Sequence, residues 1–460
     1  MGVDISPFSS IRELAKALKQ RKVSSQELTA MYIKRLETLG EAHRAVAQMT
    51  TELAMKQAKL ADNSEAKSLL HGIPFGVKDL FAVPGYKTRW GSKGHDEQEF
   101  PYTATAVQRL FDRGGVLVAK LAMIELAGGG NYDSPAASST GACLSAWDKT
   151  RWAGGSSSGS GAATGLGAVA YSLGTETSGS ILCPSSFNGD TGFRPTYGRV
   201  SRFGAMALAW THDKIGPICR SADDCQIVLE AIAGPDSKDR STIRSHFRPS
   251  LGGKKPVIGL MKQEFSKYKA KACEKSYEQA IEVFHKLGYE TVDVEMPKKP
   301  YGTAVSIIVN AEGASAHEHF IRSEKLSMVA DPVQMAGLLA SLETPATDYL
   351  WALRFRSEAL KANSIWDKCD GVFMPVFYHG AVPADEPLGK SFANMGGGDE
   401  GPANLLGWPA LTFPIGFDSD GLPLNGQILC PCFGEPTCLR VAKDFQRETD
   451  FHKKHPAETL

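Results

Sequence analysis

The stretch WAGGSSSGSGAATGLGAVAYSLGTETSGSILCPSSFNGDTGFRPTYGRV, from Trp152 to Val200, decides how this chain folds. It is rich in Gly, Ser and Thr and poor in charge, a composition that is also typical of a flexible linker. The apolar, β-branched run Val169–Leu173 and the flanking Trp152 and Phe193 argue against a linker, because such residues are mostly buried in folded proteins. We therefore predict a folded loop–helix–strand–loop unit that carries two serines.

Two polar turns of this unit contain the serines. The first is Gly154-Gly155 followed by Ser156, and the second is the run Thr175–Ile181. Between them, Ser160–Thr164 is expected to form a helical turn of small residues. Such a helix has weak intrinsic propensity, and we expect it to persist because small side chains let neighbouring backbones pack closely.

Three common Gly/Ser motifs do not fit this unit. The spacing Gly159-x-Gly161-x-x-x-Gly165 is close to a dinucleotide fingerprint, but the residues before it do not form the core strand that this motif follows. A Walker loop would end in Gly-Lys-Ser/Thr, and a nucleophile elbow would read Gly-x-Ser-x-Gly. No nearby histidine offers itself as a base, and His71 and His212 fit core positions.

A lysine can also activate a serine, provided that the lysine is neutral. Its pKa must then fall from about 10.4 to about 7, which burial away from water achieves. In the segment HGIPFGVKDLF, the apolar run Ile73–Val77 is typical of a buried strand, and it ends at Lys78. Lys120 is the nearest rival. The alternative for Lys78 is a side chain that turns outward or pairs with Asp79.

Together these segments resemble the amidase signature family. The motifs are Lys78 in GIPFGVKD, Gly154-Gly-Ser-Ser, and the turn Thr-x-Thr-x-Gly-Ser-Ile followed by GFRPTYGRVSRFG. Further matching segments are NLLGWPALTFP at 404–414 and GLPLNGQ at 421–427. The resemblance therefore covers nearly the whole chain, in long and ordered motifs.

The resemblance implies a Ser–cis-Ser–Lys triad. Ser180 would be the nucleophile, and Ser156 would be the bridging serine that follows a cis peptide bond. Lys78 would be the base that takes a proton from Ser156 and, through it, from Ser180. The oxyanion hole would be formed by backbone N–H groups of the second turn, those of Thr177, Ser178, Gly179 and Ser180.

Within the second turn, the sequence departs from the family's usual Asp-Thr-Gly-Gly-Ser-Ile-Arg. Glu176, Ser178 and Leu182 stand where Asp, Gly and Arg are usual. Ser178 is expected to restrict the backbone, and Leu182 removes a positive charge. No triad residue is lost, so these departures bear on loop geometry and on the substrate.

A run of glycines upstream is interpreted as a wall of the substrate pocket, because glycines allow close backbone approach and positive φ. An ordinary loop is the alternative. The run and its neighbour comprise Gly128, Gly129, Gly130 and Asn131. Further candidates for the lining are Trp90, Tyr132 and Met206.

Strands alternate with helices along the rest of the chain, which favours a parallel or mixed sheet. The resemblance implies one α/β domain over residues 1–460, an α/β/α sandwich with a central twisted mixed β-sheet. Its expected parts are an N-terminal helical layer (1–70), the amidase signature core (71–235), a helical/α-β insertion that shapes the pocket (236–368), and C-terminal strands that complete the sheet (369–460).

Local patterns predict several individual elements. Capping boxes are predicted at Ser10 with Glu13 and at Ser24 with Glu27. Residues 195–217 are expected to be turn-rich. Strands are predicted at Val257–Met261, Glu290–Val294, Gly371–Met374, Ala410–Ile415 and Gly426–Leu429, and helices at Ser221–Ala233 and Cys273–Leu287.

The composition limits the classes of partner and cofactor. Lys+Arg and Asp+Glu both number 51, so no basic excess points to nucleic acid. The 9 cysteines fit reduced cytosolic thiols, and Cys430, Cys432 and Cys438 lack zinc-site spacing. The start MGVDISPFSS lacks a secretory signal, and no long apolar run predicts a membrane span. We expect a cytoplasmic protein without metal, cofactor, nucleic acid or membrane partner.

The function implied by the resemblance is an amidase that hydrolyses a small-molecule carboxamide through an acyl-enzyme on Ser180. An aryl amide, an ester or a carbamate would be open to the same chemistry. The alternative is the A subunit of a tRNA-dependent amidotransferase, which works with partner subunits. An inactive scaffold is a third reading, which the intact triad disfavours. A homodimer is an option by analogy alone.

Overall fold

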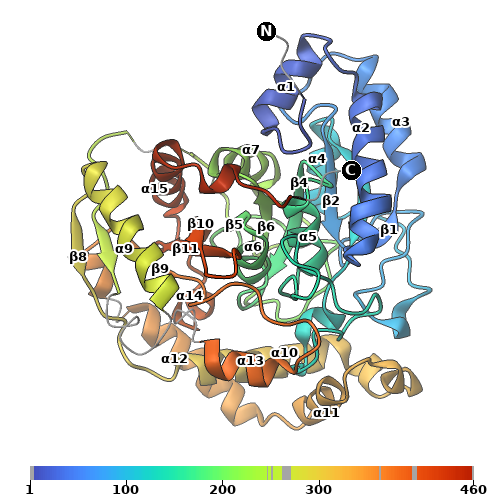
Figure 1. Ribbon diagram of the computed structural model, residues 1–460. Coiled ribbons are helices and arrows are strands. Elements are labelled where there is room, and N and C mark those ends of the chain that lie inside the picture. Colours follow the sequence, from blue (N-terminus) through green and yellow to red (C-terminus); the bar gives the residue numbers. More distant parts are fainter. Residues whose placement is uncertain are drawn as a thin grey trace.

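One large mixed β-sheet runs through the molecule. The computed structural model describes residues 5–245, 247–249, 252–261, 271–361, 364–395 and 401–457. Among these residues, the sheet has 11 strands in the order β1-β3-β2-β4-β6-β5-β10-β11-β9-β7-β8. Helices cover both of its faces (Figure 1). The predicted α/β/α sandwich with a central mixed sheet is confirmed.

The strands of the sheet are short, and most are fully buried. They are β1 Val46–Met49, β2 Pro74–Lys78, β3 Val116–Leu121, β4 Tyr171–Glu176, β5 Thr191–Arg194, β6 Lys214–Cys219, β7 Ile258–Leu260, β8 Thr291–Asp293, β9 Gly371–Pro375, β10 Ala410–Phe417 and β11 Pro423–Leu429.

Among the helices, α1 to α3 lie at the upper right of Figure 1 and α10 to α13 along the bottom. The helices are α1 Ile11–Lys19, α2 Ser25–Arg35, α3 Thr51–Asp62, α4 Thr105–Asp112, α5 Ser158–Gly165, α6 Leu182–Asn188, α7 Ala222–Ile232, α9 Lys271–Lys286, α10 Tyr301–Ile321, α11 Pro332–Ser341, α12 Ala346–Lys361, α13 Leu388–Met395, α14 Gly401–Leu406 and α15 Glu435–Glu448.

The register of four central strands brings distant polar residues together. β2 is parallel to both β3 and β4, with Val77 opposite Leu173. The carboxyl ends of β2 and β4 therefore lie at the same edge of the sheet. β6 runs antiparallel to β4 and places Lys214 opposite Glu176, so the start of β6 reaches that edge as well.

Most of the elements predicted from local patterns are confirmed. Both capping boxes are formed, at Ser10 with Glu13 and at Ser24 with Glu27. The predicted strands correspond to β7, β8, β9, β10 and β11, and the predicted helices to α7 and α9. The N-terminal layer is not purely helical, because β1 also lies within residues 1–70 and pairs with β3.

Two central strands, β5 and β6, were not among the predicted elements, and β6 begins inside the segment expected to be turn-rich. Its Gly216-Pro217 pair is typical of a turn rather than of a strand interior. The structure supplies the reason for the glycine. A Cβ at Gly216 would lie 1.9 Å from the carbonyl oxygen of Phe193, so β6 accommodates only glycine beside the adjoining backbone.

The small-residue helix α5 packs as the sequence predicts. All its residues are buried. A Cβ at Gly159 would lie 2.3 Å from the carbonyl oxygen of Ala45, and one at Gly161 would lie 2.7 Å from that of Pro184. Neighbouring backbones thus contact the helix directly, which holds a sequence of weak helix propensity in place.

Helix α11 docks on the loop that carries the glycine run. Gln334 Nε2 donates to the carbonyl oxygens of Glu125 and Gly129, at 2.7 and 3.0 Å. Asp331 Oδ2 accepts from the backbone N–H of Asp133 at 2.7 Å. Helix α11 and its N-cap residue Asp331 therefore fix the backbone of the loop predicted to form a pocket wall.

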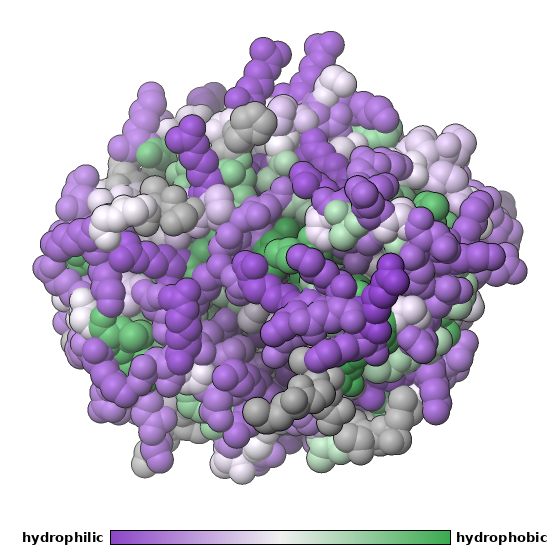
Figure 2. All heavy atoms as spheres, turned by 90° about the horizontal axis from the view of Figure 1, so that it is seen from above, coloured by the Kyte–Doolittle hydropathy of each residue, from purple (hydrophilic) through white to green (hydrophobic). Residues whose placement is uncertain are grey.

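The face of the molecule seen in Figure 2 is mostly hydrophilic, with hydrophobic side chains in small separate groups. It presents no broad apolar area of the kind that marks large protein interfaces. None of the helices within the described ranges combines the length and the apolar character needed to cross a membrane.

A substitution in α11 tests the contact between this helix and the loop that carries the glycine run. Gly337→Ala would place a Cβ 1.6 Å from the carbonyl oxygen of Gly130, against backbone that cannot turn aside. We expect the free energy of unfolding to fall by about 1–3 kcal/mol, as for other overpacked sites, measured by denaturant unfolding.

The matched control is Gly302→Ala in α10, where a Cβ meets nothing within 4 Å. The alanine there is expected to be neutral or to raise the free energy of unfolding, because alanine favours a helix over glycine. Equal effects of the two substitutions would contradict the docking.

Candidate functional site

Lys78 ends β2 with its side chain fully buried. Its Nζ lies 2.8 Å from Ser156 Oγ and 3.0 Å from Thr175 Oγ1. Burial lowers the pKa of Lys78 to about 7, and the carboxylates of Asp213 and Glu176 oppose this shift. A large fraction of Lys78 is therefore neutral at neutral pH, as a general base requires.

The first serine turn delivers Ser156 to this lysine. The Gly155–Ser156 peptide bond is cis, and Gly154 has a φ of +80°. A Cβ at Gly154 would lie 2.9 Å from the backbone of Pro184, so both its conformation and its surroundings require glycine. Two residues after Ser156, at Ser158, α5 begins.

Ser180, the predicted nucleophile, is held beside Ser156 through the backbone. Its carbonyl oxygen accepts from the N–H of Ser157 at 3.3 Å. The structure describes both predicted catalytic serines, Ser156 and Ser180, and places no direct hydrogen bond between their hydroxyl groups. Such bonds are commonly long before a substrate binds. The fold thus brings Lys78, Ser156 and Ser180 together from β2 and the two predicted turns.

Glu176 closes the second turn from the end of β4. Its Oε2 accepts from the N–H groups of Ile181 and Leu182 at 2.8 and 3.0 Å, and its Oε1 accepts from Arg194. Burial raises the pKa of Glu176, but Arg194, Lys214 and the backbone donors outweigh it and hold that pKa below its usual value. Glu176 is therefore a charged anchor of the turn.

The departures at positions 178 and 182 have simple structural readings. Ser178 is exposed and is not among the residues with positive φ, whereas Gly179 has a φ of +81°. Only Gly179 needs glycine, so the expected restriction at Ser178 carries no backbone strain. Leu182 is fully buried in an apolar cluster with Ala410 and Leu429, and an apolar side chain suits that place.

Three residues of the site were missed by sequence reasoning. Thr175 is a partner of Lys78, although it lies in β4 rather than in the predicted turn. Asp213 Oδ1 accepts from Thr177 Oγ1 at 2.6 Å, and Lys214 Nζ donates to the carbonyl oxygen of Thr177 at 3.3 Å. The sequence around Asp213 and Lys214 looks turn-rich, so it gave no signal of their place beside the second turn.

Lys78 does not pair with Asp79, as the alternative would have had it. Lys120 makes that ion pair, with its Nζ 2.8 Å from Asp79 Oδ1 and both side chains buried. Burial raises the pKa of Asp79 against the influence of Lys120. Lys120, the alternative candidate for the base, is thus paired with a carboxylate. The sequence context predicts burial for Lys78, and the structure buries Lys120 and Lys214 as well.

The glycine run lies between α11 and the first serine turn. A Cβ at Gly130 would lie 2.5 Å from the backbone N of Leu338, and Asn131 is exposed. Tyr132 reaches further, because its hydroxyl lies 3.1 Å from the Cβ position of Gly155. Tyr132 is therefore the residue of this loop that approaches the catalytic turns. Trp90 packs against His317 instead.

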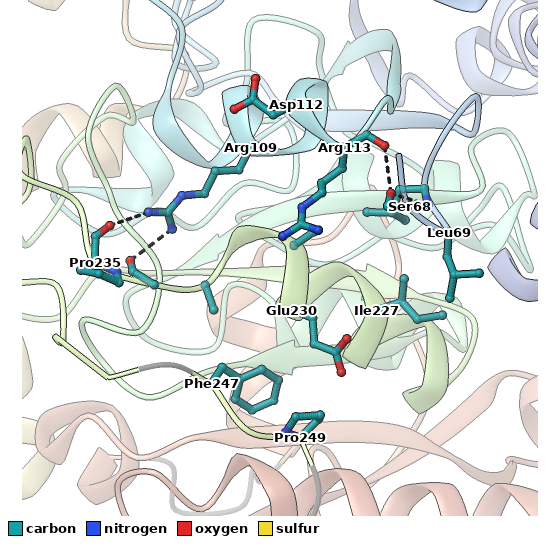
Figure 3. Close-up of a pocket in the computed structure, with 14 residues that line it drawn as sticks. Ser68, Leu69, Arg109, Asp112, Arg113, Ile227, Glu230, Pro235, Phe247 and Pro249 are labelled. Carbon is teal, nitrogen blue, oxygen red and sulfur yellow. Dashed lines mark hydrogen bonds between the residues drawn. The ribbon is translucent and has the colours of Figure 1, made fainter. Parts of the chain in front are cut away.

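A cavity of about 830 Å³ lies elsewhere, between α4 and α7. Figure 3 shows Arg109 and Arg113 on one side of it and Glu230 and Phe247 on the other. None of the predicted site residues lines this cavity. In the parts of the chain described here, no cluster of three or more His, Cys, Asp or Glu could hold a metal.

Comparison with known proteins gives one family. A family model described as Amidase matches residues 27–439. The A subunit of glutamyl-tRNA(Gln) amidotransferase from Caldanaerobacter subterraneus subsp. tengcongensis is 32% identical over 488 residues, which cover 97% of this chain and 98% of the relative.

Two solved structures illustrate the structural likeness. The peptide amidase from Stenotrophomonas maltophilia is 26% identical, with a TM-score of 0.83 over 96% of this chain and 97% of that one. The A subunit of glutamyl-tRNA(Gln) amidotransferase from Thermotoga maritima is 25% identical, with a TM-score of 0.81 over 98% of this chain and 97% of that one.

The two neighbouring positions of the second turn should respond differently to substitution. Ser178→Gly removes an exposed side chain from unstrained backbone, and we expect the free energy of unfolding to change by less than about 0.5 kcal/mol. Gly179→Ala forces a side chain into the left-handed region and should cost about 1–2 kcal/mol. Denaturant unfolding measures both, and a larger cost at 178 than at 179 would contradict the backbone described here.

Proposed function

Because the chain belongs to the amidase family, we propose that it cleaves a carboxamide through an acyl-enzyme on Ser180. One observation carries the proposal, namely the 2.8 Å approach of Lys78 Nζ to Ser156 Oγ at the end of a fully buried strand. A neutral lysine in that place has a lone pair within reach of the hydroxyl, so it accepts the proton that the serine gives up.

The proposed reaction begins with two proton transfers. Lys78 takes the proton of Ser156, Ser156 takes that of Ser180, and Ser180 Oγ attacks the carbonyl carbon. The C–O bond forms as the carbonyl π pair moves onto oxygen. The resulting oxyanion binds to backbone N–H groups of the second turn, which are already fixed in place and so need no reorganisation.

Collapse of the intermediate completes the transfer. The pair on oxygen re-forms the C=O bond, the C–N bond breaks, and the proton held by Lys78 returns through Ser156 to the leaving amine. A water molecule or another nucleophile then attacks the acyl-enzyme along the same route. Ser180 is regenerated, and the acyl group leaves with the new nucleophile.

Two more specific functions, hydrolysis and nitrogen transfer, share this first step. An independent amidase passes the acyl group to water and discards the nitrogen, whereas an amidotransferase passes the nitrogen to an acceptor. The comparisons support the A subunit of a tRNA-dependent amidotransferase better than an independent small-molecule amidase. Curated relatives with that name are 32% identical over nearly the whole chain, whereas among solved structures the peptide amidase and the A subunit are almost equally similar, at 26% and 25% identity.

Substitution of the triad tests the shared chemistry. Ser180→Ala should abolish release of p-nitroaniline from anilides and labelling by a fluorophosphonate, because no nucleophile remains. Lys78→Ala should lower both rates by at least about 100-fold, the lower range for a general base. Full activity of Lys78→Ala at neutral pH would contradict the lysine-base mechanism.

The matched controls are Ser64→Ala and Lys59→Ala. Both side chains are exposed and lie in or after α3, away from the site. We expect both control variants to keep the rates of the unsubstituted chain, so that a loss at Ser180 or Lys78 reports the chemistry and not a general effect of handling.

The acceptor is tested with and without partners. We expect the purified chain alone to cleave simple carboxamides slowly. Addition of the partner subunits, glutamyl-tRNA(Gln), an amide donor and a nucleoside triphosphate that activates the acceptor carboxylate should raise the rate and yield amidated tRNA. Turnover that is already fast and that partners leave unchanged would favour the independent amidase. Amide and product are followed by mass spectrometry.

A further inference from the structure

A further buried lysine, Lys214, lies at the start of β6 next to the predicted oxyanion turn. Its Nζ donates to the carbonyl oxygen of Thr177 at 3.3 Å and to Asn404 Oδ1 at 3.2 Å. The antiparallel pairing of β4 with β6 sets this position, because Glu176, the residue before Thr177, lies opposite Lys214.

The bond to Thr177 acts on the peptide group that joins Thr177 to Ser178. The carbonyl oxygen of Thr177 and the N–H of Ser178 belong to the same peptide unit. Hydrogen bonds in series polarise one another, so a donor on this carbonyl makes the N–H of Ser178 a stronger donor. That N–H is one of the four predicted for the oxyanion hole.

The residue before Lys214 fixes the same threonine from its side chain. Asp213 Oδ1 accepts from Thr177 Oγ1 at 2.6 Å. The carboxylate of Asp213 is itself held by the backbone N–H groups of Leu208 and Ala209, with contacts of 2.9 to 3.2 Å. Asp213 and Lys214 therefore hold both the hydroxyl and the carbonyl of Thr177.

Charged groups from several elements face Lys214. Burial lowers the pKa of Lys214 to about 7, Arg194 and Arg356 lower it too, and Glu176 and Asp213 raise it. His212 is adjacent, and its own pKa is lowered by burial and by Lys214. Lys214 thus changes its charge in the neutral range, close to where Lys78 does.

We propose that Lys214 is a positioning residue of the oxyanion turn, which in its protonated form strengthens the N–H of Ser178 through the carbonyl of Thr177. This inference rests on the proposed acyl-enzyme chemistry. Protonated Lys214 also supplies a positive charge beside the turn, in which Leu182 stands where an arginine is usual.

The two lysines then have opposite requirements. Lys78 acts when neutral, so the rate rises as pH increases through its pKa. Lys214 acts when protonated, so the rate falls as pH increases through its own. Because the oxyanion develops only in the transition state, the effect of Lys214 falls on the rate of reaction and not on binding.

Phosphonylation of Ser180 by a fluorophosphonate tests this without knowledge of the natural substrate. In that step the Ser180 Oγ–P bond forms, fluoride leaves, and the serine proton passes to Lys78. We expect a bell-shaped dependence of the maximal rate on pH. Lys214→Met should lower that rate about tenfold at neutral pH, leave the half-saturating probe concentration unchanged, and remove the alkaline decline.

Lys214→Arg is the decisive second variant, because the guanidinium of arginine stays charged over the whole pH range of the experiment. We expect a rate near that of the unsubstituted chain at neutral pH and no alkaline decline. Lys59→Met, at an exposed lysine, should keep both limbs of the profile.

An alkaline decline that persists in Lys214→Arg overturns the inference, even if Lys214→Met does not fold. So does a Lys214→Met variant that folds and changes only the half-saturating concentration. Labelling that persists in Ser180→Ala would instead overturn the proposed function, so the two failures are distinguishable.

Discussion

The burial of Lys78 at the end of β2 is the constraint on which the site depends. Lowering a lysine pKa from 10.5 to about 7 corresponds to roughly 5 kcal/mol between its charged and neutral forms. That difference persists only if no carboxylate pairs with the amine. The carboxylate next to it in sequence, Asp79, pairs with Lys120, and Lys78 donates instead to the hydroxyls of Ser156 and Thr175.

Around Lys78, buried charged side chains form ion pairs with one another. Glu176 is held by Arg194 and by two backbone N–H groups, and it anchors the second turn. Buried ion pairs gain little net stability, because desolvation offsets their attraction. Their value here is geometric: each pair fixes one strand end or one turn, so that the serines meet the lysine at a defined place.

The sequence was informative where motifs are contiguous and weak where contacts are distant. Lys78, Ser156 and Ser180 lie in long local motifs, and the small-residue helix between the turns follows from composition. Lys214 lies in a segment that looks turn-rich, and its burial arises from the pairing of β4 with β6. The partner of Asp79 likewise follows from the register of β2 and β3. No local pattern encodes either contact.

The departures from the usual turn are best understood together. Position 178 tolerates serine because the left-handed conformation is confined to Gly179. Position 182 takes leucine because its side chain packs in the apolar core, and the cations near the turn come from β5 and β6 instead. Burial lowers the pKa of Lys214, beside this turn, to about 7, and its proposed role as a positioning residue would make the predicted oxyanion turn respond to pH. Under these two proposals the chain keeps the chemistry of the family, while a residue outside the motifs quoted above adjusts it.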